Sequence, residues 1–152
     1  MFPRLFGNEY RLASRRTRRY NCIAWAAGND RAWWDAGPGG FWPDGVLDDG
    51  SVEAAVQLYE HYGYTRTMNS APEEGVERIA IYGDDLGYTH AARQLPDGTW
   101  TSKLGKLQDI EHRALENLFG ERYGRAVQFM EKRPGAPPSP DLKKAKRRRR
   151  RA

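Results

Sequence analysis

The sequence predicts a single α+β domain, because helical and strand-like patterns follow one another within a chain of 152 residues. Three strand-like segments lie at residues 76–82, 88–95 and 99–103, and turn residues separate them. Ahead of them, residues 48–63 place apolar side chains at the i, i+3, i+4 and i+7 positions of a helix. These patterns predict an antiparallel sheet of about four to five strands with helices packed on it.

A short helix is expected at residues 21–27, after an N-terminal segment without a clear apolar period. Its alanines favour helix, and Gly28 ends it. The first turn holds Cys22, the only cysteine of the chain. Unpaired backbone amides and the helix dipole stabilise a thiolate at such a position, so the sequence predicts a depressed pKa for Cys22.

Residues 29–43 indicate a loop rich in glycine, proline and tryptophan. Its aromatic side chains predict either that the loop is pinned to the body of the domain or that it walls a substrate groove. A third interpretation makes Trp33, Trp34 and Trp42 the contact surface of an interaction protein. A helix at residues 48–63 and a short strand at residues 64–68 follow the loop.

The hairpin between the second and third strands of the meander sets the expected position of His90. Pro96, Asp97 and Gly98 form a strong turn signal. If the turn is centred on Asp97, the register places His90 diagonally across from Ser102, on the same face of the sheet.

The C-terminal third is expected to contain a helix at residues 108–119 and a final strand at residues 124–130. The domain is therefore assigned to residues 1–133. The proline-rich residues 134–140 predict an extended linker, and residues 141–152 predict a disordered basic tail.

The basic character of the chain comes from this tail. The formal net charge of the chain is +5, but residues 141–152 carry eight lysines and arginines and one aspartate, a charge of +7. The preceding part is therefore slightly acidic, at −2. The run at residues 143–151 is dense enough to bind nucleic acid or another anionic partner without base specificity, or it is a solubilising extension.

Several classes of protein are excluded by composition. No apolar run reaches the ~20 residues of a membrane span, and the N-terminus lacks the apolar region of a signal peptide. One cysteine and three scattered histidines give no metal spacing, and no glycine motif fits a phosphate, so neither metal nor cofactor is expected. We expect a cytoplasmic protein, or an effector that is exported without a cleaved signal.

His90 is the candidate base for Cys22. A cysteine nucleophile needs an imidazole within hydrogen-bond reach, and packing of the short helix on the sheet brings distant residues together. Ser102 is one candidate to orient the imidazole. Asp109 is the other, a stronger electrostatic orienter that lies in the connection after the sheet.

These residues stand in segments that resemble an uncharacterised bacterial domain family. The segments are YNCIAWA at residues 20–26, THAARQL at residues 89–95 and TWTSKLG at residues 99–105. That family is similar to the papain-like NlpC/P60 and CHAP superfamily of cysteine peptidases and amidases. Its enzymes carry a cysteine at a helix start, then a histidine at a strand start and a polar residue on the next strand, and Cys22, His90 and Ser102 match this order.

The resemblance covers about residues 20–130 and implies a papain-like fold with an N-terminal nucleophile helix. It implies a cysteine-dependent hydrolase (peptidase or amidase) or an acyltransferase with a peptide or amide substrate. Ser102 departs from the usual His, Asn, Asp or Glu, and the missing export signal favours an intracellular enzyme over a cell-wall hydrolase. The alternative is an inactive binding module that engages an anionic partner through residues 143–151.

Overall fold

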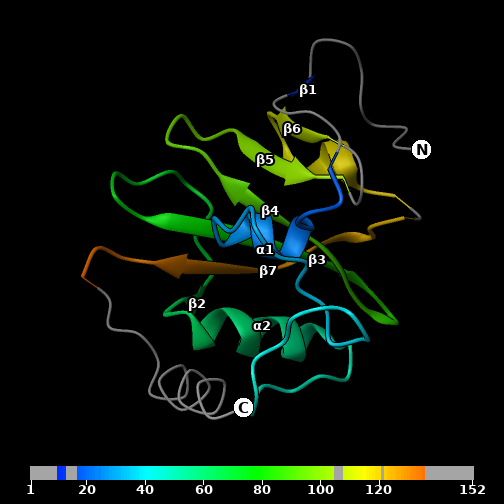
Figure 1. Cartoon of the computed structure of the whole chain (residues 1–152). Coiled ribbons are helices and arrows are strands. Elements are labelled where there is room, and N and C mark those ends of the chain that lie inside the picture. The colour runs from blue at the N-terminus through cyan, green and yellow to red at the C-terminus, as the bar shows by residue number, and fades with distance from the viewer. Residues whose placement is uncertain (1–9, 13–16, 105–107, 121, 136–152) are drawn as a thin grey trace.

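The computed structural model describes residues 10–12, 17–104, 108–120 and 122–135. These residues form one antiparallel sheet of seven strands in the order β1-β6-β5-β4-β3-β7-β2 (Figure 1). The strands are β1 (Tyr10–Leu12), β2 (Thr65–Thr67), β3 (Glu77–Asp84), β4 (Gly87–Gln94), β5 (Trp100–Lys103), β6 (Asp109–His112) and β7 (Arg125–Lys132). The helices are α1 (Cys22–Ala26), α2 (Val52–His61) and the 3-10 helix η1 (Leu115–Leu118).

The expected α+β papain-like fold is wrong, because the described domain is mainly β. Helix α1 has five residues and α2 has ten, beside seven strands where four to five were expected. The largest error is the helix expected at residues 108–119. Its first part is β6, which pairs with both β5 and β1, and its last part is only the short η1. Backbone hydrogen bonds to two neighbouring strands outweigh the helical preference of this segment.

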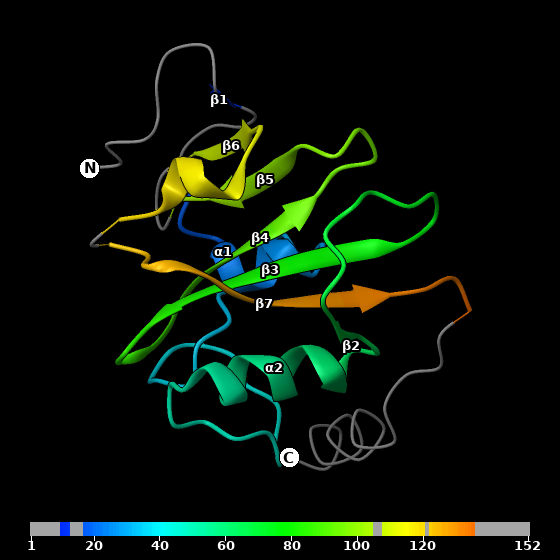
Figure 2. The ribbon, with the colours of Figure 1, turned by 180° about the vertical axis from the view of Figure 1, so that it is seen from behind.

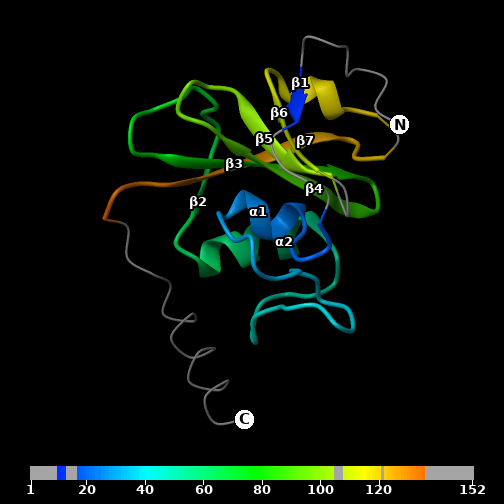
Figure 3. The ribbon, with the colours of Figure 1, turned by 45° about the horizontal axis from the view of Figure 1, so that its top comes forward.

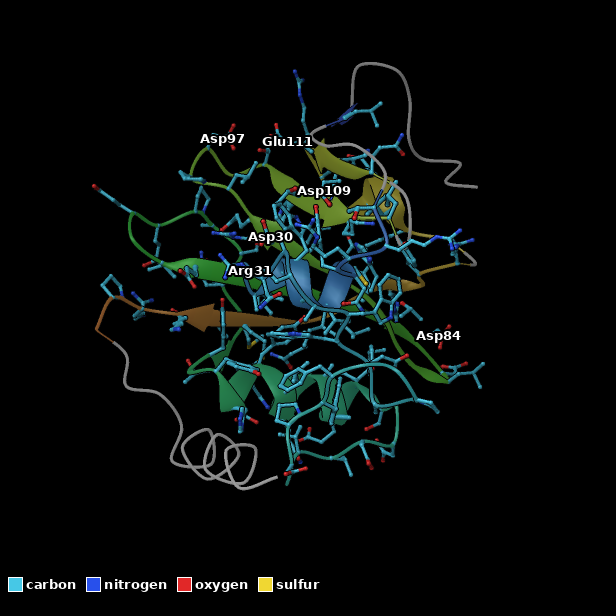
Figure 4. All side chains as sticks on the ribbon, viewed as in Figure 1. Asp30, Arg31, Asp84, Asp97, Asp109 and Glu111 are labelled. Carbon is cyan, nitrogen blue, oxygen red and sulfur yellow. The ribbon has the colours of Figure 1, made fainter. Side chains whose placement is uncertain are left out.

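The other expected elements are confirmed. Helix α1 begins after Asn21, and α2 begins after Ser51, whose hydroxyl accepts a hydrogen bond from the Ala54 amide at 3.1 Å. The strands expected near residues 64–68, 76–82, 88–95, 99–103 and 124–130 correspond to β2, β3, β4, β5 and β7. Figure 4 shows Asp97 at the turn between β4 and β5, with Asp84 at the opposite end of the sheet.

The sheet has two buried faces. Helices α1 and α2 cover one of them, which we call the helix face, and η1 packs on the other, which we call the η1 face (Figures 2 and 3). Ile81 and Ala91 face the two α-helices, whereas Tyr82 and Ala92 face η1. Because successive side chains of a strand point to opposite faces, each central residue of β3 and β4 can be assigned either to the helix face or to the η1 face.

Strands β4 and β5 separate after a short stretch of pairing. Among the described residues, their ladder pairs only Arg93 with Thr101 and Gln94 with Trp100. Helix α1 packs against both strands beside the point where they part (Figure 3). The first part of β4 therefore has no β5 partner, and this gap is the place where α1 meets the sheet.

The tryptophan-containing loop is pinned to the domain. Trp34 is buried and stacks on Tyr62 with ring centroids 4.9 Å apart. Trp42 stacks on Tyr88 at 6.3 Å and donates its indole N–H to the Leu47 carbonyl at 3.1 Å. Burial of Trp34 and the indole hydrogen bond of Trp42 therefore hold the loop against the domain.

The expected linker and basic tail fall mostly at residues 136–152, outside the described residues. Within the part of the chain that the structure describes, no helix has the length and hydropathy that would let it cross a membrane.

Candidate functional site

Cys22 occupies the first position of α1, where Asn21 fixes the start of the helix. The Asn21 carboxamide oxygen accepts hydrogen bonds from the Ala24 amide at 3.2 Å and from the Trp34 amide at 3.1 Å. Its Nδ2 donates to the Trp34 carbonyl at 2.7 Å. The buried cap therefore ties the Cys22 end of α1 to the tryptophan loop and holds the thiol in one place.

The thiol of Cys22 is protonated at neutral pH. Burial raises its pKa to about 11. The nearby backbone amides of Ala91 and Ile23, the amide of Cys22 itself and the charge of Lys103 lower the pKa but do not offset burial. The expected depressed pKa is wrong: Cys22 is half-buried, and the amides of a helix of five residues lower its pKa by less than desolvation raises it.

The Ala91 amide reaches the sulfur because β5 has left β4 at this point. Ala91 is paired with Ile81 on the β3 side, and the last β4–β5 pair is at Arg93. The Cys22 sulfur therefore lies close to the Ala91 amide, beyond the last β4–β5 pair. Three backbone N–H groups around one atom form a small site that stabilises negative charge.

His90 points away from Cys22, to the η1 face. It pairs with Tyr82 across the β3–β4 ladder, and the two rings meet edge to face at 5.1 Å. Tyr123 stacks on the imidazole with centroids 4.1 Å apart. His90 is 0% exposed, and neither ring nitrogen has a hydrogen-bond partner among the described residues. The structure therefore does not bring His90 into hydrogen-bond contact with Cys22.

Burial lowers the pKa of His90 well below its ordinary value, and the nearby His112 lowers it further. The imidazole is neutral at pH 7 and is in the form that accepts a proton. A buried imidazole with two unused nitrogens is rare, since each lost hydrogen bond costs about 1–3 kcal/mol.

Ser102 does not orient His90, because it is engaged with His112. Its Oγ lies 2.8 Å from Nε2 of His112, whose Nδ1 lies 2.9 Å from the Ala114 carbonyl oxygen. A carbonyl oxygen only accepts, so the hydrogen is assigned to Nδ1, and Nε2 accepts from the Ser102 hydroxyl. Burial lowers the pKa of His112 to about 4, which keeps this tautomer neutral at pH 7.

His112 was not among the residues predicted from sequence. It was missed because residues 108–119 were expected to form a helix, although Asp109, Ile110, Glu111 and His112 fit the alternating pattern of a strand. In β6, His112 is paired with Trp100 and lies diagonally across from Ser102 on the η1 face.

Asp109 lies on the helix face and binds Tyr20. Its Oδ2 accepts a hydrogen bond from the Tyr20 hydroxyl at 2.5 Å, and it is paired with Lys103 across the β5–β6 ladder. Lys103 is wholly buried, donates from Nζ to the Thr17 carbonyl at 2.8 Å, and lies 5.4 Å from the centroid of the Tyr20 ring. Figure 4 shows Asp109 on the same side of the sheet as α1.

The predicted site residues thus divide between the two faces of the sheet. Cys22 and Asp109 lie on the helix face with Lys103, while His90 and Ser102 lie on the η1 face. The helix face offers a thiol with backbone amides around it, and the η1 face offers neutral imidazoles. The described residues hold no group of three or more His, Cys, Asp or Glu side chains placed to bind a metal ion.

A protein-family model matches the chain. The model, described as a domain of unknown function (DUF7689), covers residues 11–131. No curated protein and no solved structure matches the chain.

Proposed function

The chain belongs to the DUF7689 family of domains of unknown function, and we propose from its own site that it is a cysteine-dependent hydrolase or acyltransferase. The bond attacked is a peptide or amide bond, Cys22 is the nucleophile, and His90 is the base. The order of Cys22, His90 and Ser102 along the chain, which resembles that of the NlpC/P60 and CHAP enzymes, supports the same assignment.

One observation carries the proposal. The Cys22 sulfur faces backbone amides that include the N–H of Ala91, and the preceding residue of β4 is the buried His90, whose imidazole has no hydrogen-bond partner among the described residues. The thiol lies beside the Ala91 amide on the helix face, and the unused neutral imidazole belongs to the preceding residue of β4, on the η1 face. The proposal therefore takes the nucleophile, the oxyanion donors and the base from neighbouring positions, with His90 moving to meet the thiol.

The protonation states define the mechanism. With the pKa of Cys22 at about 11 and that of His90 well below its ordinary value, the resting pair is a neutral thiol and a neutral imidazole. The proton moves from sulfur to His90 as the sulfur attacks the carbonyl carbon. The amides of Ile23 and Ala91 donate to the oxyanion, and His90 returns the proton to the leaving amine.

The thioester left on Cys22 is then cleaved by water or by an acceptor amine, with His90 again taking the proton. For these transfers the His90 ring turns about its Cα–Cβ bond, out of its stack on Tyr123 and into the gap between β4 and β5. Loss of that stack costs on the order of 1 kcal/mol, which substrate binding can supply.

Acetylation by p-nitrophenyl acetate tests the proposal, with the same thiol in the urea-unfolded chain as the reference. Release of p-nitrophenolate and intact mass give the rate and the site of acetylation. We expect native Cys22 to react at least about a hundredfold faster than unfolded Cys22 at pH 7. Cys22→Ala removes the adduct, and His90→Gln brings the rate below that of the unfolded chain, because the desolvated thiol then has a raised pKa and no base.

His61→Gln is the matched control, because His61 is a buried histidine of α2 that takes no part in the proposed chemistry. It is expected to keep the wild-type rate. A native Cys22 that reacts no faster than the unfolded chain would contradict the proposal, since a buried thiol with a raised pKa and no base reacts slowly.

A further inference from the structure

A cavity of about 360 Å³ opens where the turn between β4 and β5 meets the loop before β3. We call it the proline cavity, because Pro72 on the loop and Pro96 on the turn both line it. The two segments touch, since a Cβ on Gly98 would lie 3.2 Å from Cγ of Pro72. Its volume is at the lower end of the range of small-molecule sites, about 300–1,000 Å³.

A buried arginine holds the loop in place and makes the cavity a formed feature of the fold. Arg78 is 0% exposed; it donates to the Ala71 carbonyl, and at 3.3 Å to Gln94 Oε1. Its Nη2 pairs with Glu73 at 3.0 Å, and Arg133 binds the other oxygen of that carboxylate at 3.1 Å. Glu73 and Arg78 are therefore committed to structure.

Three further charged side chains of the cavity wall are not paired with each other. Among the described residues, neither the guanidinium of Arg93 nor the carboxylate of Glu74 makes a hydrogen bond or ion pair. Glu77 makes no ion pair and accepts one hydrogen bond, from the Tyr64 hydroxyl at 3.0 Å. Glu74 and Glu77 are exposed, and Arg93 is half-buried with its guanidinium beside Gly28, where a Cβ would lie 3.3 Å from Nη1. One cation and two anions thus contribute to the lining of one cavity, and no ion pair joins Arg93 to either carboxylate.

We propose that the proline cavity binds a free basic amino acid, of the arginine or lysine type. Its α-carboxylate lies on Arg93, whose planar guanidinium suits bidentate recognition of a carboxylate. Its α-ammonium and its side-chain cation lie on Glu74 and Glu77. A ligand with one anionic and two cationic groups matches a wall with one cationic and two anionic groups, and Val76 and Leu95 contact its methylene chain.

The site is separate from the proposed thiol chemistry, and binding is measured without any reaction. L-Arginine is titrated into the ¹⁵N-labelled full-length protein, and amide shifts of the residues that line the cavity are followed. Two other ligands test the contacts separately. Agmatine lacks the α-carboxylate, and L-citrulline lacks the side-chain cation. We expect saturable shifts around Glu77 and Leu95 with L-arginine, and at least about tenfold weaker binding of each of the other two.

Variants assign the contacts. Arg93→Gln is expected to weaken L-arginine at least about tenfold and to leave agmatine unchanged, because agmatine has no carboxylate to lose. Glu74→Gln is expected to weaken both L-arginine and agmatine. The matched control is Asp85→Asn, which removes an exposed carboxylate at the far turn of β3 and β4 and is expected to change neither affinity. Arg93→Lys keeps the charge and serves if the glutamine variant fails to fold.

Two results would overturn the inference. One is the absence of saturable shifts with L-arginine at concentrations up to about 10 mM, which would limit the binding free energy to less than about 3 kcal/mol. The other is agmatine binding as tightly as L-arginine, which would show that Arg93 recognises no carboxylate.

Discussion

Acidification is expected to destabilise the protein through His112, and the size of the effect follows from its buried hydrogen bonds. The pKa of His112 falls to about 4 in the folded chain, whereas an unperturbed histidine has a pKa near 6.5. The unfolded chain therefore binds a proton more tightly than the folded chain does. The contribution of His112 to stability is complete above about pH 6.5 and is lost as the pH falls toward 4.

The magnitude is about 3 kcal/mol. Each tenfold difference in proton affinity between the folded and unfolded states is worth about 1.4 kcal/mol, so a fall in pKa from 6.5 to about 4 corresponds to roughly 3 kcal/mol. His112 is 1% exposed, and both of its nitrogens already have partners, Ser102 and the Ala114 carbonyl, so little solvent screening reduces the effect. Protonation at Nε2 would also force the Ser102 hydroxyl to give up its role as donor.

Urea unfolding at pH 7, 5.5 and 4, followed by circular dichroism, measures the free energy of unfolding. Carboxylates also titrate in this range, so the comparison is with His112→Gln, which keeps an acceptor for Ser102 but does not titrate. The wild type is expected to lose about 3 kcal/mol more than the variant between pH 7 and pH 4. Equal losses in the two proteins, within about 0.5 kcal/mol, would refute the assignment of a buried neutral imidazole.

Three further predictions follow from other parts of the molecule. In His90→Gln, which lacks the proposed base, alkylation of Cys22 by iodoacetamide should rise with an apparent pKa near 11, and a midpoint near the ordinary ~8.5 would show that its thiol is not desolvated. Asn21→Ala should lower the free energy of unfolding by about 2 kcal/mol, because the cap on Ala24 and the two hydrogen bonds to Trp34 are lost together; a loss under about 0.5 kcal/mol in urea would contradict this. Deletion of residues 141–152 should abolish salt-sensitive binding to duplex DNA in a gel shift, and equal binding by the truncated chain would exclude the tail as the anchor.

Local signals in the sequence predicted much of the central sheet. The turn at Pro96, Asp97 and Gly98 set the register of its hairpin, and the observed pair of Arg93 with Thr101 is centred on Asp97 as expected. Turn chemistry acts over a few residues and can therefore be read without knowledge of the rest of the fold. The same holds for the Asn21 cap of α1, because its hydrogen bond is made to a residue three positions along the chain.

The face of the sheet on which His90 lies could not be predicted, because both faces of β3 are buried. Ile81 packs against the α-helices and Tyr82 packs against η1, and both are apolar or aromatic and fully buried. Alternation of apolar and polar residues shows which side is inside only when the other side meets water. The sequence likewise gave no sign that the β4–β5 ladder would stop before His90.

The pKa of Cys22 depends on tertiary packing that no local pattern contains. The helix start and its amides were predicted correctly, but the desolvation that outweighs them comes from distant elements that bury the thiol. Asp109 shows the same dependence. It is a candidate to orient His90 from the connection after the sheet, but it lies in β6, where the Tyr20 hydroxyl 89 positions earlier in the chain binds it on the helix face.

The crystal structure of the protein alkylated at Cys22 with iodoacetamide tests the central claim most directly, because the added group carries an amide carbonyl one methylene away from the sulfur. We predict that the carbonyl oxygen accepts a hydrogen bond from the amide of Ile23 or Ala91. We also predict that His90 has left Tyr123, with a ring nitrogen within about 3.5 Å of the sulfur. A carbonyl oxygen without amide donors, above a His90 ring still stacked on Tyr123, would contradict the assignment of Cys22 and His90 as nucleophile and base.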